Sequence, residues 1–98
     1  MAAQAATLTC LAGLAVSHPN LPSAYITLSR HVPNELSVQL DSPSKVEAWR
    51  EVLNVSTDKV FVDVIGGQPS LEFDATVYGV AFHVYAVYNP ATAEAVAA

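Results

Sequence analysis

The sequence predicts an α+β domain in which a five-stranded antiparallel sheet carries two helices on one face. Two segments repeat apolar residues at helical spacing, and five segments alternate apolar with polar residues. Pro, Gly and Asn residues separate these segments and mark the turns between them. The predicted order along the chain is α-β-β-α-β-β-β, for which a two-layer architecture is the simplest solution.

Length and composition agree with this fold class. The 98 residues fit a single domain over 1–98, without a linker or an internal repeat. Hydrophobic residues make up 52% and charged residues 13% of the chain, a composition that excludes intrinsic disorder for most of it. A domain of this size buries only about 60–65% of its unfolded surface, so we expect some apolar surface to need a partner.

The first helix is predicted over residues 5–17. Apolar residues form one stripe at helical spacing, namely Leu8, Leu11, Leu14 and Ala15. Polar residues fall off this stripe, namely Thr7, Thr9 and Ser17. Pro19 and Pro22 follow, and two prolines so close together end the helix.

A β-hairpin is predicted over residues 23–41, with a turn-rich loop at 30–34. Each of its two strands alternates apolar with polar residues. The register that places all six apolar residues on one face pairs Leu28 with Leu36, Ile26 with Val38, and Ala24 with Leu40.

The second helix is predicted over residues 43–54. Ser42 is a candidate N-cap, and Pro43 suits the first helical position. Apolar residues again form one stripe, namely Val46, Trp49, Val52 and Leu53. We therefore expect this helix to pack on the apolar face of the sheet.

A three-stranded meander is predicted over residues 59–88, followed by an alanine-rich tail over 89–98. Its strands cover 59–65, 70–77 and 80–88. Four residues, Gly66-Gly67-Gln68-Pro69, form the first turn, and two residues, Tyr78-Gly79, form the second. The second turn is unfavourable for tyrosine, because tight hairpin turns often need a positive φ at both positions.

These turns define the predicted registers of the meander. Asp74 is expected opposite His83 on one side and opposite Phe61 on the other. Asp63 is expected opposite Glu72, a like-charge pair that would be unfavourable by a few tenths to about 1 kcal/mol. A wet surface would tolerate that pair, and a bound cation would relieve it.

The alternate residues of the five strands are predicted to form the face opposite the helices. Aromatic and acidic side chains are concentrated there, which is typical of a recognition surface. The predicted partner-binding residues are Tyr25, Phe61, Asp63, Glu72, Asp74, His83 and Tyr85. The alternative is a solvated sheet face with a few aromatic cross-strand pairs.

Asp74 with His83 is the acid–imidazole pair that the predicted registers place in contact. Such a pair needs a nucleophile or a bound water for catalysis, so we interpret it as a surface hydrogen bond. Asp63 and Glu72 add possible metal ligands, but the chain lacks the tight ligand spacing of metal-binding motifs. We therefore predict no catalytic residues, no metal and no cofactor.

The charge balance narrows the possible partners. Nine acidic residues outnumber four basic ones, for a net charge of −5. Binding to phosphates requires clustered cations, so we expect no direct contact with nucleic acid. The basic residues are scattered, namely Arg30, Lys45, Arg50 and Lys59.

The first part of the chain bears on localisation. The apolar run over residues 5–16 is too short to span a membrane and lacks the basic residues of a signal peptide. Cys10 is the only cysteine, so no internal disulfide is available, and we interpret it as a small core residue. These observations predict a cytoplasmic protein with no membrane contact.

Three features together span most of the chain: the break His18-Pro19-Asn20-Leu21-Pro22, the helical segment Val46-Glu47-Ala48-Trp49, and the turn Tyr78-Gly79-Val80 before an alternating strand. In this layout the chain resembles small uncharacterised proteins of high-GC Gram-positive bacteria and their phages. The resemblance implies no activity, and no functional residues transfer from it. A phage origin would imply an accessory or host-interaction role.

Three hypotheses for function follow. The leading one is a non-enzymatic binding or accessory protein, self-associating as a homodimer, that acts through its exposed sheet face. The first alternative is an acidic inhibitor, for instance a phage anti-defence protein, that occupies a cationic nucleic-acid-binding groove. The second alternative is a small metal-dependent hydrolase that uses Asp74 and His83.

Overall fold

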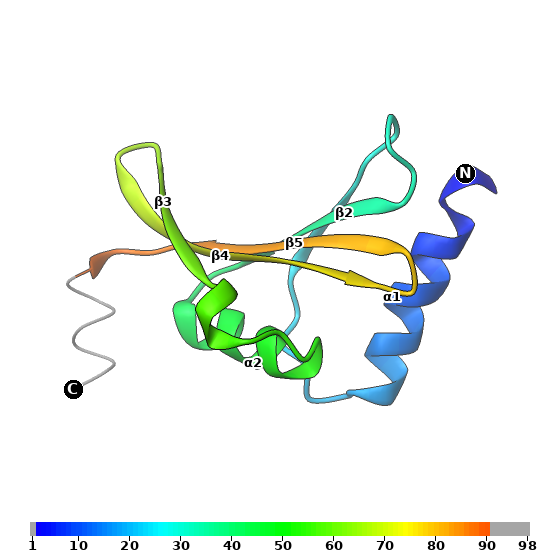
Figure 1. Cartoon of the computed structure of the whole chain (residues 1–98), viewed down its shortest axis with the longest axis horizontal. Coiled ribbons are helices and arrows are strands. Elements are labelled where there is room, and N and C mark those ends of the chain that lie inside the picture. The colour runs from blue at the N-terminus through cyan, green and yellow to red at the C-terminus, as the bar shows by residue number, and fades with distance from the viewer. Residues whose placement is uncertain (1, 91–98) are drawn as a thin grey trace.

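The computed structural model describes residues 2–90 and shows an α+β fold, with one five-stranded sheet and two α-helices (Figure 1). The elements in chain order are η1 (Ala2–Gln4), α1 (Ala5–Ser17), β1 (Tyr25–Leu28), β2 (Glu35–Leu40), α2 (Pro43–Val52), η2 (Thr57–Lys59), β3 (Phe61–Ile65), β4 (Gln68–Val77) and β5 (Val80–Val87). The short 3-10 helices η1 and η2 are additional to the seven predicted helices and strands. Most of the predicted tail, 91–98, lies outside the described residues.

The sheet is mixed, so the prediction of a wholly antiparallel sheet is wrong. Its strand order is β1-β2-β5-β4-β3, and β2 runs parallel to β5 while the other neighbours are antiparallel. The helix α2 explains this, because it carries the chain back so that β3 runs in the same direction as β2. The meander then brings β5, which is parallel to β3, against the free edge of β2.

Two of the predicted registers are confirmed. In the first hairpin Ile26 lies opposite Val38, and Leu28 lies opposite Leu36. In the second, Asp74 lies opposite His83 across the β4–β5 pair. Alternation alone found these registers, because a shift by one residue would move every apolar side chain to the wrong face.

The predicted β3–β4 register is wrong by two residues. The turn uses only Gly66 and Gly67, whose φ angles of 59° and 81° suit a two-residue hairpin turn. Gln68 therefore begins β4 opposite Ile65 and is not part of the loop. A shift of two residues exchanges strand partners but keeps every side chain on its predicted face.

The core lies between the sheet and α2. Ser42 takes the N-cap position of α2 and Pro43 its first turn, and the helix turns Val46 and Trp49 inward. The indole Nε1 of Trp49 donates to the carbonyl of Pro22 at 2.9 Å, which satisfies the one polar atom of this large side chain. The buried apolar residues are Leu36, Val38, Leu40, Val46, Trp49, Leu53, Phe73, Val80, Phe82, Val84 and Ala86.

The helix α1 does not lie flat on the sheet beside α2. It stands at the end of the sheet where β4 turns into β5 (Figure 1). Cys10, Leu11 and Leu14 pack partly against the core from this position. None of the described helices is long and apolar enough to cross a membrane.

The buried residue of α1 is Thr7, which the predicted stripe had placed on the polar side. Its side chain is 1% exposed, and its Oγ1 donates to the carbonyl of Pro33 at 2.5 Å. The apolar stripe did not predict the burial of Thr7, because the contact that buries it comes from the loop between β1 and β2, which packs against this helix. A loop offers backbone carbonyls, and a buried hydroxyl can satisfy one of them.

Candidate functional site

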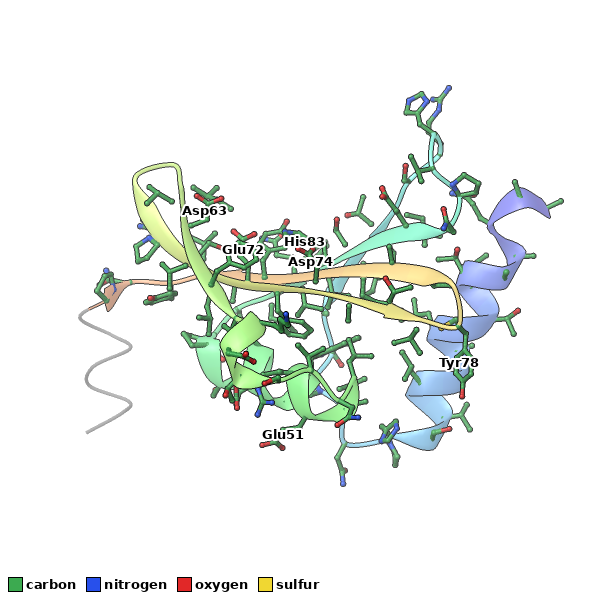
Figure 2. All side chains as sticks on the ribbon, in the orientation of Figure 1. Glu51, Asp63, Glu72, Asp74, Tyr78 and His83 are labelled. Atoms are coloured by element: carbon green, nitrogen blue, oxygen red, sulfur yellow. The ribbon has the colours of Figure 1, made fainter. Side chains whose placement is uncertain are left out.

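The candidate site is the face of the sheet opposite α2, which we call the open face. The β3–β4 hairpin and the loop between β1 and β2 both rise on this side, so the open face lies between two projections (Figure 1). Figure 2 shows Asp63, Glu72, Asp74 and His83 on this side, and Glu51 away from it below α2.

Cross-strand pairing arranges the open face in rows. One row crosses all five strands and contains Tyr25, Gln39, Tyr85, Glu72 and Phe61. The next row contains Thr27, Ser37, His83 and Asp74. Six of the seven predicted partner-binding residues therefore belong to two neighbouring rows. The seventh, Asp63, lies beyond them, opposite Ser70.

His83 is held between two carboxyl groups at the centre of these rows. Its Nδ1 lies 2.6 Å from Oδ1 of Asp74, its direct cross-strand partner. Its Nε2 lies 2.9 Å from Oε1 of Glu72, its diagonal neighbour on β4. We refer to these three residues as the acid–imidazole cluster. The sequence predicted the contact with Asp74 and missed the contact with Glu72, although diagonal neighbours lie within reach of long side chains.

Both ring nitrogens of His83 face carboxyl oxygens, so each side of the imidazole is in contact with an acidic side chain.

The cluster has one buried and one exposed acid. Glu72 is 4% exposed, whereas Asp74 is exposed and His83 is half-buried. Among the described residues, Oε2 of Glu72 and Oγ of Ser70 are buried without a hydrogen-bond partner. Burial of a carboxyl group is costly unless it is paired, and the contact with His83 supplies a partner for Glu72 at this position.

The aromatic residues extend the surface around the cluster. The ring of Tyr85 stacks on that of His83, with centroids 5.4 Å apart and an interplanar angle of 30°. The hydroxyl of Tyr85 donates to Oε1 of Gln39 at 3.4 Å. Tyr25 is strongly exposed at the β1 edge and Phe61 is partly exposed at the β3 edge.

A groove of about 410 Å³ lies beside the cluster on the open face. About half of its lining is polar, with hydroxyl groups from the β1–β2 hairpin and from Thr76 on β4 and the carboxylates of Glu35 and Asp74. The lining residues are Thr27, Ser29, Glu35, Leu36, Ser37, Asp74, Ala75, Thr76, Ala81, Phe82 and His83. Neither lysine nor arginine contributes to it.

The predicted positions of Asp63 and Phe61 are wrong. Asp63 lies opposite Ser70, so it makes no like-charge pair with Glu72, and Phe61 lies opposite Glu72 instead of Asp74. The tight turn at Gly66 and Gly67 is the cause of both changes. Within residues 2–90, no group of three or more His, Cys, Asp and Glu side chains is arranged to hold a metal ion.

The clear pKa changes of acidic and basic side chains lie in and next to α2, away from the open face. A hydrogen bond from Lys45, which lies 2.8 Å from Asp41, lowers the pKa of that aspartate. A hydrogen bond from Arg50 lowers the pKa of Glu47 in the same way and raises the pKa of the arginine itself. These pairs neutralise two of the four basic residues of the chain.

Comparisons of this chain with protein-family models, with curated proteins and with solved structures find no match.

Proposed function

We propose that this protein is a non-enzymatic binding protein whose open face receives a basic segment of another protein. The observation that carries the proposal is the groove beside the acid–imidazole cluster. It presents the carboxylates of Glu35 and Asp74 among hydroxyl groups, without a lysine or arginine in its lining. A lysine or arginine side chain from a partner would find charge complementarity and hydrogen-bond acceptors there.

The remaining charges support this choice of partner. Lys45 and Arg50 are paired with acids of their own helix region, and Arg30 and Lys59 are exposed outside the groove. The net charge of −5 favours the approach of a cationic partner over that of an anionic one. For the same reason, a second copy of this chain is a poor occupant of the open face, because two acidic grooves would face each other.

The acid–imidazole cluster supports binding over catalysis. Both ring nitrogens of His83 face carboxyl oxygens, so neither faces an open position in which a nucleophile could lie. An Asp–His unit acts in catalysis when the second nitrogen faces the reacting group. Here Glu72 occupies that position.

The acidic groove also favours the alternative of an inhibitor that occupies a cationic nucleic-acid-binding groove of a host or defence protein. That alternative uses the same residues of this chain, but it requires that the partner's binding site also binds nucleic acid. If a nucleic acid competes with this chain for the partner, the chain acts as an inhibitor.

The proposal is tested by titrating the isotopically labelled protein with a short lysine–serine peptide and recording backbone amide shifts by NMR. We expect the largest changes at Thr27, Ser37 and Thr76, and weaker binding as salt is added. Asp74→Asn should weaken binding several-fold, whereas the matched control Asp58→Asn, on η2, should leave it unchanged. Shift changes spread over α2, or equal weakening by both variants, would contradict the proposal.

A further inference from the structure

The strand β3 forms an exposed apolar edge of the sheet. All five of its residues are exposed. Among the described residues, four of the eight exposed large hydrophobic side chains belong to this strand, namely Phe61, Val62, Val64 and Ile65. The α2 layer does not extend beneath it far enough to cover either of its valines. An uncovered apolar edge strand is a template for pairing with another strand.

The backbone of this edge offers hydrogen-bonding groups at defined residues. In an antiparallel hairpin closed by two turn residues, the residues on either side of the turn exchange hydrogen bonds, here Ile65 and Gln68. Going back along β3 from Ile65, every second residue bonds in the same way to its own partner on β4. The N–H and C=O groups of Val62 and Val64 therefore point away from β4. The N–H of Val64 is taken by Oδ1 of its neighbour Asp63 at 2.8 Å. Val62 is thus the residue on β3 that keeps both outward groups available.

We propose that two copies of this chain dimerise by pairing their β3 strands antiparallel, about a two-fold axis beside Val62. In this register each Val62 exchanges N–H···O=C hydrogen bonds with Val62 of the second copy. The two five-stranded sheets then join into one, and the exposed valines of both copies meet on the same face. A two-fold axis makes the contact self-complementary and closes it at two subunits.

The distribution of charged residues supports a second copy as the partner of β3 and determines the register of the pairing. Two chains of net charge −5 repel each other at most surfaces, but the β3–β4 turn and β3 carry a single charged residue, Asp63. A two-fold axis at Asp63 would place two aspartates directly opposite, which is destabilising. The axis at Val62 places Asp63 opposite Phe61 of the second copy instead.

This contact is separate from the groove of the proposed function, because no residue of β3 contributes to the groove lining. The two proposals can therefore fail independently. A pair of five-residue strands is small for a protein interface, so we expect a dissociation constant in the micromolar range, about 1–100 µM.

The test combines solution mass with cross-linking. Sedimentation velocity over a concentration series should show the wild-type protein passing from monomer to dimer. Val62→Lys should weaken the dimer by about tenfold or more, since it places two like charges directly opposite each other at the axis. Val62 is 59% exposed, so the substitution should leave the fold, measured by circular dichroism, unchanged.

Single cysteines test the register in a Cys10→Ala background. Val62→Cys should form an intermolecular disulfide with copper–phenanthroline in air, because Cα atoms of a hydrogen-bonded pair lie about 5.5 Å apart. Val64→Cys is the matched control, because its two copies would lie at least about 13 Å apart. A wild-type chain that stays monomeric at high concentration, or a disulfide with Val64→Cys and not with Val62→Cys, would overturn the proposal.

Discussion

Glu72 and His83 meet diagonally across the β4–β5 pair, with Oε1 of the acid 2.9 Å from Nε2 of the imidazole. Glu72 has Tyr85 as its direct cross-strand partner, so the contact requires its side chain to lean along the strand towards the next row. It places a half-buried imidazole against a buried carboxyl group and an exposed one. The buried carboxyl group therefore depends on a side chain of the open face for its partner.

Removal of the imidazole should destabilise the protein. His83→Ala leaves Glu72 buried without a charge-compensating partner, and we expect the free energy of unfolding to fall by about 2–3 kcal/mol in urea denaturation. The control Asp74→Ala removes the exposed acid and should cost less than about 1 kcal/mol. Glu72→Gln added to His83→Ala should recover part of the loss. Equal costs for the two single variants would show that Glu72 does not depend on His83.

Tyr78 should be a suboptimal turn residue. Its φ of 50° is in the left-handed region, and its side chain is 94% exposed, so little packing offsets the backbone strain. Tyr78→Asn, which forms an Asn-Gly turn, should raise the free energy of unfolding by about 0.5–1 kcal/mol. The control Tyr78→Val should lower it, because a β-branched residue disfavours this conformation. A loss of stability with asparagine would mean that the tyrosine ring contributes through packing on α1.

Cys10 should react slowly with alkylating reagents. Burial raises the pKa of the Cys10 thiol, so a smaller fraction is thiolate at pH 8 than in an exposed cysteine. We expect iodoacetamide to modify the native protein several-fold more slowly than the urea-unfolded one. The thiol lies 3.8 Å from the carbonyl oxygen of Val77. A native rate equal to the unfolded rate would show that the thiol is freely accessible there.

Stability should decline at acidic pH through the ion pairs of the α2 region. Hydrogen bonds from Lys45 and Arg50 lower the pKa values of Asp41 and Glu47 below their ordinary values of 3.8 and 4.5. The unfolded chain then binds protons more readily than the folded one, so this stabilisation is present above pH 4.5 and is lost as pH falls through the folded-state values.

A pH series of urea denaturation checks this expectation. Glu47→Gln should make stability less dependent on pH between about 5 and 3, whereas Glu51→Gln should change it little, because Glu51 lies 3.9 Å from Arg50. An acid limb unchanged by Glu47→Gln would assign the acid sensitivity to other carboxylates.

Much of the candidate site could be predicted because it depends on a local periodicity. Alternation in the two hairpins is enough to predict Ile26 opposite Val38 and Asp74 opposite His83, as the structure has them. The prediction for β3 was wrong because the turn has two residues, Gly66 and Gly67, where a four-residue loop was predicted. Both turns keep each side chain on the same face of the sheet, but they give β3 different cross-strand partners. Asp63 and Phe61 therefore kept their expected face of the sheet and lost their expected neighbours.

The sequence by itself determined the two helices, the five strands and the side of the sheet on which most strand residues lie. These follow from backbone geometry, in which side chains repeat every 3.6 residues in a helix and every two in a strand. Only the tertiary structure decided that β2 lies parallel to β5, that Thr7 is buried beside a loop, and that Glu72 is the second acid on His83. Each depends on which distant segments α2 and the tight turns bring together, and no local pattern records that choice.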